Sequence, residues 1–138
     1  MTARRVEDVQ IERVADEILV VKEESLEAHA LNQSAATVYE LCDGNTSKSE
    51  MAAEIHRRTG LPADEEIVDL ALSELVETGL VMLDDPESVS TGTRRALIRR
   101  LALSSTLALM LPVVETVVVP PADAQVISRT PTPTPIRL

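Results

Sequence analysis

Three short segments near the start of the chain alternate apolar and polar residues as β-strands do. Residues 18–21, Ile-Leu-Val-Val, form the strongest run because β-branched residues favour extended backbone. Residues 9–14 form a weaker run before it, and residues 26–31 alternate again after a polar break at residues 22–25. Breaks of this length are typical of hairpin loops, so we expect a three-stranded antiparallel sheet.

Two helices are predicted next from the residues that begin and end them. Asn32 is a good N-cap for a first helix, which closes at Asp43-Gly44 because glycine readily adopts the left-handed conformation. Ser47 and Glu50 have the spacing of a capping box and begin a second helix. Gly60 ends that helix. These local signals define the helix boundaries without any tertiary information.

A third helix is predicted from Asp64 to Gly79, with carboxylates in its first turn that suit the positive end of the helix dipole. An apolar run at residues 80–83 indicates a short final strand. The element order indicates an α+β, winged-helix-like domain over residues 1–84, followed by a linker with Pro and Gly at residues 85–93. The expected buried stripes of the three helices comprise Ala35, Val38, Tyr39, Leu41 and Cys42; Met51, Ala52 and Ile55; and Ile67, Val68, Ala71, Leu72, Leu75 and Val76.

The charge of the chain is divided between two segments. The formal net charge is −10, but residues 1–92 carry 7 basic and 21 acidic side chains, whereas residues 93–138 carry 6 basic and 2 acidic ones. The predicted third helix has six acidic residues and no basic one, so DNA phosphates would repel it. Tyr39 is the only aromatic residue, which leaves no platform for stacked bases. These features argue against nucleic-acid binding.

No residue pattern indicates an enzyme. Cys42 has no partner for an intramolecular disulfide, and its place on an apolar stripe predicts a small core hydrophobe. His29 and His56 do not form a metal-ligand spacing with it, and we expect His29 to be an exposed polar residue of its strand. No phosphate-binding loop, carboxylate pair or serine nucleophile motif is present. We therefore expect no catalytic residue, metal or cofactor, and a cytoplasmic location because the N-terminus lacks the features of a signal peptide.

Two segments resemble a known family. Residues 31–44 follow a pattern of leucine-asparagine, small residues, an apolar residue, leucine and aspartate-glycine, and the third helix ends in Leu75-Val76-Glu77-Thr78-Gly79-Leu80-Val81. Their order and spacing resemble the pyrroloquinoline quinone biosynthesis protein D (PqqD-like) family over roughly residues 9–83. The resemblance implies a winged-helix recognition element that binds the leader of a ribosomally made precursor peptide. It also implies a partner that modifies the peptide, often a radical S-adenosylmethionine protein.

The resemblance implies a location for the peptide as well. In the family mode, the leader adds as a strand beside the third strand, and its apolar side chains enter a groove against the third helix. Small residues on the third strand would allow close approach, carboxylates on the helix would meet basic leader residues, and Leu70 or Ala71 would meet apolar ones. The expected peptide-binding residues are Leu26, Glu27, Ala28, His29, Ala30, Leu31, Glu66, Asp69, Leu70 and Glu74.

The C-terminal segment differs in character from the domain. Basic residues at 94–100 precede an uncharged, mainly apolar run at residues 101–114, which is shorter than the roughly twenty residues that span a bilayer. We predict a basic and then apolar helical segment over residues 94–125. The remaining residues, 126–138, are rich in Pro and Thr and are expected to be extended and disordered.

Several roles compete for this segment. The favoured one is association with a membrane surface through residues 94–119. The segment could instead be a docking helix for a partner enzyme, or a leader-like segment that occupies the domain's own groove in the same or another molecule. Its simplest role is an apolar helix that packs on the domain, with basic residues paired to the acidic surface.

The predicted function is a non-enzymatic peptide-binding adaptor that recognises a leader by strand addition and presents it to a modifying enzyme. The alternative is a winged-helix protein-interaction or regulatory module that does not contact DNA and is tethered to a membrane by its tail.

Overall fold

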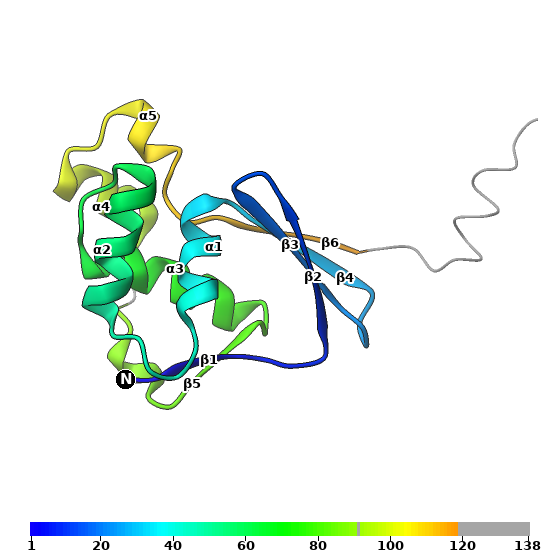
Figure 1. Cartoon of the computed structure of the whole chain (residues 1–138). Helices are drawn as coiled ribbons and strands as arrows, with labels where there is room; N and C mark the ends of the chain where they lie inside the picture. Colours follow the sequence, from blue (N-terminus) through cyan, green and yellow to red (C-terminus); the bar gives the residue numbers. More distant parts are fainter. Residues whose placement is uncertain (91, 119–138) are drawn as a thin grey trace, which may run out of the picture.

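The computed structural model describes residues 1–90 and 92–118. Helices cluster at one end of the molecule and a sheet projects from them (Figure 1). The elements in chain order are β1 (Ala3–Arg5), β2 (Val9–Val14), β3 (Glu17–Lys22), β4 (Glu27–Leu31), α1 (Gln33–Leu41), α2 (Lys48–Thr59), α3 (Glu65–Glu77), β5 (Val81–Leu83), a short 3₁₀ helix (Pro86–Ser88), α4 (Arg94–Leu101), α5 (Ser105–Ala108) and β6 (Val114–Val118). The α+β class is therefore confirmed.

The main sheet has four antiparallel strands in the order β2-β3-β4-β6. The predicted meander forms β2, β3 and β4. On the face that α1 covers, Val20 of β3 lies opposite Ile11 of β2 and His29 of β4, and Val20 is fully buried. The expectation of three strands is wrong because β6, an extended segment of the tail, adds to the edge that β4 would otherwise leave open.

A second, two-stranded sheet joins the two ends of the first 84 residues. β1 pairs antiparallel with β5, with Ala3 opposite Leu83, and neither strand belongs to the main sheet. The backbone N–H of Thr2 also donates to Asp84 Oδ1 at 2.7 Å. The predicted final strand is thus present as β5, whereas β1 was not predicted.

The predicted helix boundaries are confirmed by their caps except at the end of α1, which ends at Leu41 with Cys42 as its C-cap and not at Asp43-Gly44. Asn32 Oδ1 accepts a hydrogen bond from the backbone N–H of Ala35, and Ser47 and Glu50 form both bonds of the capping box. Gly60 ends α2 with φ of 83°, a left-handed conformation that costs glycine little. Asp64 caps α3 through the N–H of Glu66.

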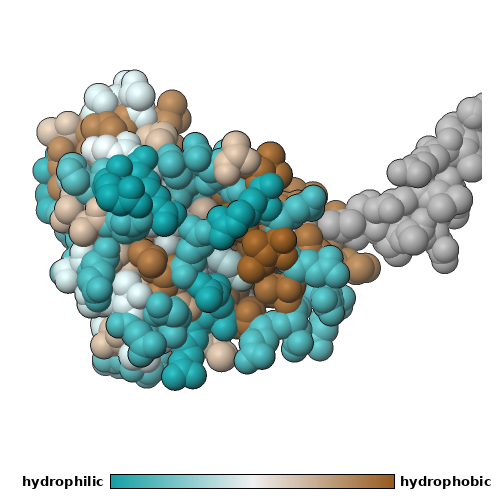
Figure 2. All heavy atoms as spheres, viewed as in Figure 1, coloured by the Kyte–Doolittle hydropathy of each residue, from teal (hydrophilic) through white to brown (hydrophobic). Residues whose placement is uncertain are grey.

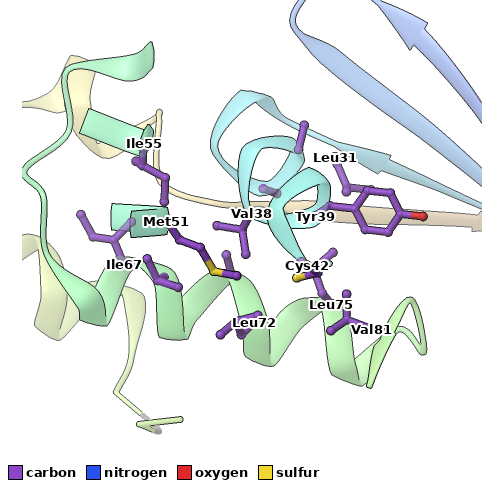
Figure 3. Packing of buried hydrophobic residues seen from close by; sticks show 14 of the residues in the cluster. Leu31, Val38, Tyr39, Cys42, Met51, Ile55, Ile67, Leu72, Leu75 and Val81 are labelled. Carbon is purple, nitrogen blue, oxygen red and sulfur yellow. The ribbon is translucent and has the colours of Figure 1, made fainter. Parts of the chain in front are cut away.

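The core consists almost entirely of aliphatic side chains between α1, α2 and α3. Figure 3 shows Val38, Met51 and Leu72 directed toward one another from the three helices. All predicted stripe residues are buried except Leu41, which is partly buried, and Val76, which is 37% exposed. The tail also contributes to this core, because Leu97 and Leu111 are buried within it.

The tail does not form the helical segment expected over residues 94–125. α4 stops at Ala102, which has a left-handed φ of 50°, and Ser104 caps the short α5. Pro112 has no backbone N–H to continue a helix, and the chain then becomes extended in β6. Residues 119–125 and the predicted disordered stretch 126–138 lie outside the described residues. No helix in the described part of the chain is long and apolar enough to cross a membrane.

Apolar side chains remain exposed on the sheet. Ile11 and Val14 of β2 and Val117 and Val118 of β6 are between 49% and 69% exposed. Figure 2 shows apolar atoms gathered over the sheet, next to the point where β6 ends. The sheet is thus less completely covered than the helical end.

Candidate functional site

The edge of β4 is occupied by an extended segment of the same chain. All five residues of β4 pair antiparallel with β6, from Glu27 opposite Val118 to Leu31 opposite Val114. Figure 1 shows β6 running alongside β4 away from the helices. The tail therefore lies along the edge where the family resemblance implies that a peptide would add.

The register identifies which backbone groups of β4 face β6. Antiparallel ladders alternate hydrogen-bonded and non-hydrogen-bonded pairs. Asn32 N–H donates to Val113 O at 3.2 Å, immediately beyond the strands. Ala30 and Ala28 are therefore the residues of β4 whose N–H and C=O groups face β6. Their side chains point to the sheet face opposite His29 and are partly buried.

His29 is buried, which corrects the expectation of an exposed residue. Its ring is 1% exposed, and Nδ1 lies 2.9 Å from Thr116 Oγ1 of β6. Burial lowers the pKa of His29, the Lys22 ammonium lowers it further, and the Glu27 carboxylate acts in the opposite direction. The residue was expected to face solvent because an edge strand has one open side, but the inner face of β4 packs toward α1 and β6 closes the edge.

Polar side chains at the start of α1 hold the segment that precedes β6. Asn32 Nδ2 donates to Leu111 O at 2.8 Å, and Asn32 Oδ1 accepts from the N–H of Val113 at 3.0 Å. Ser34 Oγ donates to Met110 O at 2.5 Å. Asn32 was expected only to cap α1, and no role was predicted for Ser34. The available signal was the polar run Asn32-Gln33-Ser34 directly after an edge strand.

Helix α3 contacts the tail through two carboxylates that were expected to meet basic peptide residues. Glu74 pairs with Arg94 at 3.3 Å and accepts a hydrogen bond from Val114 N–H at 3.4 Å. Burial raises the pKa of Glu74 above its ordinary value. Glu66 pairs with Arg100, which also contacts Asp64 at 3.0 Å.

Other predicted site residues have different surroundings. Leu70 is partly buried and lines a small pocket with Leu97 of α4. Asp69 is not on the groove surface as expected, because it is 4% exposed and pairs with Lys48 of α2 at 2.9 Å. Leu26 precedes β4 in a turn, with φ of 57°, so it is not part of the edge.

The region from residue 17 to residue 81 matches the family model described as coenzyme PQQ synthesis protein D (PqqD). Residues 17–81, just under half of the chain, are thus similar to the PqqD family, and we call the domain that contains them PqqD-like. No curated protein and no solved structure matches the chain.

The PqqD-like domain includes both elements that border the site. The match covers β3, β4 and all three helices of the core, but it ends before α4, α5 and β6. The β4 edge and the acidic face of α3 thus belong to the family domain, whereas the segment that occupies them is additional to the match.

Two observations concern the reactive side chains of the described residues. Cys42 is buried, and burial raises the pKa of its thiol to about 12, so it is a poor nucleophile. Within residues 1–90 and 92–118, no group of three His, Cys, Asp or Glu residues is placed to hold a metal ion.

Proposed function

We propose that the PqqD-like domain binds an extended peptide as an additional strand along β4 and presents it to a modifying enzyme. The observation that carries this proposal is the pairing of every β4 residue with an extended segment from outside the family match. An edge with this register offers two alternating N–H and C=O pairs, at Ala28 and Ala30, to any peptide backbone. Main-chain hydrogen bonds supply affinity, and side-chain pockets supply selectivity.

The surroundings of β4 indicate the chemistry of the ligand. A hydroxyl group is favoured opposite His29, where Thr116 now lies. An aliphatic residue is favoured in the position of Leu111, which is fully buried. Basic side chains are favoured near Glu66 and Glu74, because both carboxylates already pair with arginines. The proposed ligand is therefore a peptide with basic and aliphatic residues in its first part, followed by an extended stretch that is rich in β-branched residues.

We further propose an identity for the ligand and for the enzyme. The ligand would be the leader of a ribosomally made precursor peptide, and the modifying enzyme would be a radical S-adenosylmethionine protein, as the family resemblance implies. The helices and β5 would form a winged-helix-like unit without DNA contacts, because α3 carries several acidic residues and no basic residue that could pair with a phosphate. Membrane association of residues 94–119 has less support, since Leu97 and Leu111 are already buried against the domain.

The proposal is tested by titrating the full chain with labelled synthetic peptides from leader sequences encoded next to its gene. We expect micromolar binding that shifts the backbone amide signals of Ala28 and Ala30. The variant Ala28→Pro, which removes an N–H that faces the guest strand, should weaken binding at least tenfold. By the same alternation of the ladder, the N–H of Ile11 faces outward at the opposite edge, so Ile11→Pro is the matched control and should leave binding unchanged.

Binding that is unaffected by Ala28→Pro would place the peptide elsewhere and refute strand addition. The absence of binding by every candidate leader would refute the adaptor function itself.

A further inference from the structure

We propose that β6 is a resident guest strand: the chain's own tail occupies the peptide site, and an incoming peptide must displace it. This inference rests on the proposed function and specifies what the site contains before a peptide arrives. Residues 114–118 would thus be a ligand held within the same molecule rather than a permanent strand of the domain.

The tail has each chemical feature that the site favours in a ligand. Its arginines pair with the acidic face of α3, with Arg94 on Glu74 and Arg100 on Asp64 and Glu66. Its strand completes the ladder of β4 in continuous register, and Thr116 places a hydroxyl 2.9 Å from the His29 ring. β6 and an external peptide would therefore use the same backbone groups of β4 and could not pair with that edge together.

The tail is held firmly on the domain before β6 and loosely along β6 itself. Leu97 is 4% exposed and Leu111 is fully buried. In addition, Asn32 and Ser34 bond to the backbone between Met110 and Val113. These contacts form an anchor that remains in place when the strand moves.

The strand beyond the anchor is held by few contacts. Every residue from Glu115 to Val118 is exposed, and Val117 and Val118 expose more than half of their surface. Thr116 makes the side-chain hydrogen bond to β4, and the ladder supplies the rest. Segments with few buried contacts and solvent-exposed backbone bonds open more readily than a core. β6 can therefore leave β4 while Leu111 stays buried.

The tether gives β6 an advantage over a free peptide. A segment joined by a short flexible connection has an effective concentration in about the millimolar range. A free peptide of equal intrinsic affinity would have to reach a similar concentration to occupy half of the sites. The resident strand thus sets a threshold: weakly binding segments are excluded, and a leader with better contacts displaces it.

The test locks β6 to β4 in the full chain with a reversible bond. Glu27 and Val118 face each other as a non-hydrogen-bonded pair, for which Cα atoms are about 4.5 Å apart, within the range that a disulfide can bridge. The double variant Glu27→Cys/Val118→Cys should therefore form a disulfide within one chain. Cys42 is buried and does not compete for this bond. The probe is a fluorescein-labelled peptide of residues 109–118, whose binding is compared in the oxidised and reduced forms of this one protein.

An opposite perturbation loosens β6 instead of locking it. Val117→Pro removes the N–H that faces Ala28, whereas Val118→Pro removes an N–H that faces solvent. The two residues are adjacent, of the same type and similarly exposed, so Val118→Pro is a matched control. We expect the probe to bind Val117→Pro about tenfold more tightly than wild type and Val118→Pro as wild type. Circular dichroism of each variant confirms that the helices are intact.

The expected result is that the oxidised double cysteine variant forms a monomeric cross-link and does not bind the probe, while reduction restores binding. Equal binding by the oxidised, reduced and Val117→Pro proteins would overturn the inference, because the peptide would bind elsewhere than under β6; the general role of a peptide-binding adaptor would stand, but its assignment to the β4 edge would not. A disulfide that joins two chains would also overturn it, since the guest would then come from a second copy. Failure of every variant to bind the probe, although hydrogen exchange shows the Ala28 amide of Val117→Pro to be open, would instead overturn strand addition at β4.

Discussion

Truncation of Leu111 is the most direct test of whether the tail is docked on the domain. The side chain is fully buried, and the backbone on either side of it is hydrogen-bonded to Asn32 and Ser34. Leu111→Ala removes three carbon atoms from this site without changing a polar group. A buried leucine truncated in this way costs about 2–5 kcal/mol when the surrounding core cannot collapse.

The measured loss will be at the lower end of that range. We expect the tail to detach while α1, α2 and α3 remain folded, and in that case the loss of global stability cannot exceed the free energy with which the tail docks. We therefore expect Leu111→Ala to lower the free energy of unfolding by about 2 kcal/mol. Leu109 is the matched control because it is the same residue two positions away and 80% exposed. Leu109→Ala should change stability by no more than about 0.5 kcal/mol.

The assay is urea unfolding of the full chain, followed by circular dichroism and by the fluorescence of Tyr39. Tyr39 is the only aromatic residue and is 1% exposed, so its emission reports on the core alone. Hydrogen exchange of the Ala28 amide reports separately on whether β6 remains paired. If Leu111→Ala and Leu109→Ala have the same stability and the same exchange at Ala28, the tail is not anchored through Leu111 and the reasoning fails.

Three further predictions concern other parts of the chain. Burial, and then the nearby Lys22, lower the pKa of His29. The stability that depends on the neutral ring is therefore present above about pH 6.5 and is lost as the pH falls below it. In urea unfolding between pH 7.5 and about pH 5.5, His29→Gln should make the free energy of unfolding depend less on pH than in wild type. Asp69→Ala leaves the Lys48 ammonium without its carboxylate partner and should cost about 2 kcal/mol in urea unfolding, whereas a value near zero would mean that the ion pair is not formed. Leu26→Gly should raise the melting temperature, because glycine relieves a left-handed backbone worth about 1 kcal/mol and the leucine side chain is half exposed; a lower melting temperature would contradict this.

The helical part of the fold was predictable because its signals are local. Asn32, Ser47 and Gly60 act on backbone groups within four residues of themselves, so their effect can be deduced from the neighbouring sequence. The alternation in β3 and β4 likewise follows from side chains of the strand itself. These elements were placed correctly without knowledge of the remaining chain.

The site was less predictable because it depends on contacts between distant residues. The pairing of β6 with β4 joins residues nearly 90 positions apart, and the tail was interpreted from its apolar content as a helical segment. The β-branched run from Val113 to Val119 did carry a strand signal. Asp69 was assigned to the wrong surface because helical spacing alone does not reveal that Lys48 approaches from α2.

The direction of β6 determines where a bound chain leaves the domain. β6 runs antiparallel to β4 and ends with Val118 opposite Glu27, beside the turn between β3 and β4. That turn contains Glu23 and Glu24, both exposed. A peptide that binds with the same polarity would release its C-terminal part beside this acidic turn, at the far end of the sheet from the helices. Under the proposed function, a modifying enzyme would therefore meet the released part of the peptide at the tip of the sheet, at the end away from the helices (Figure 1).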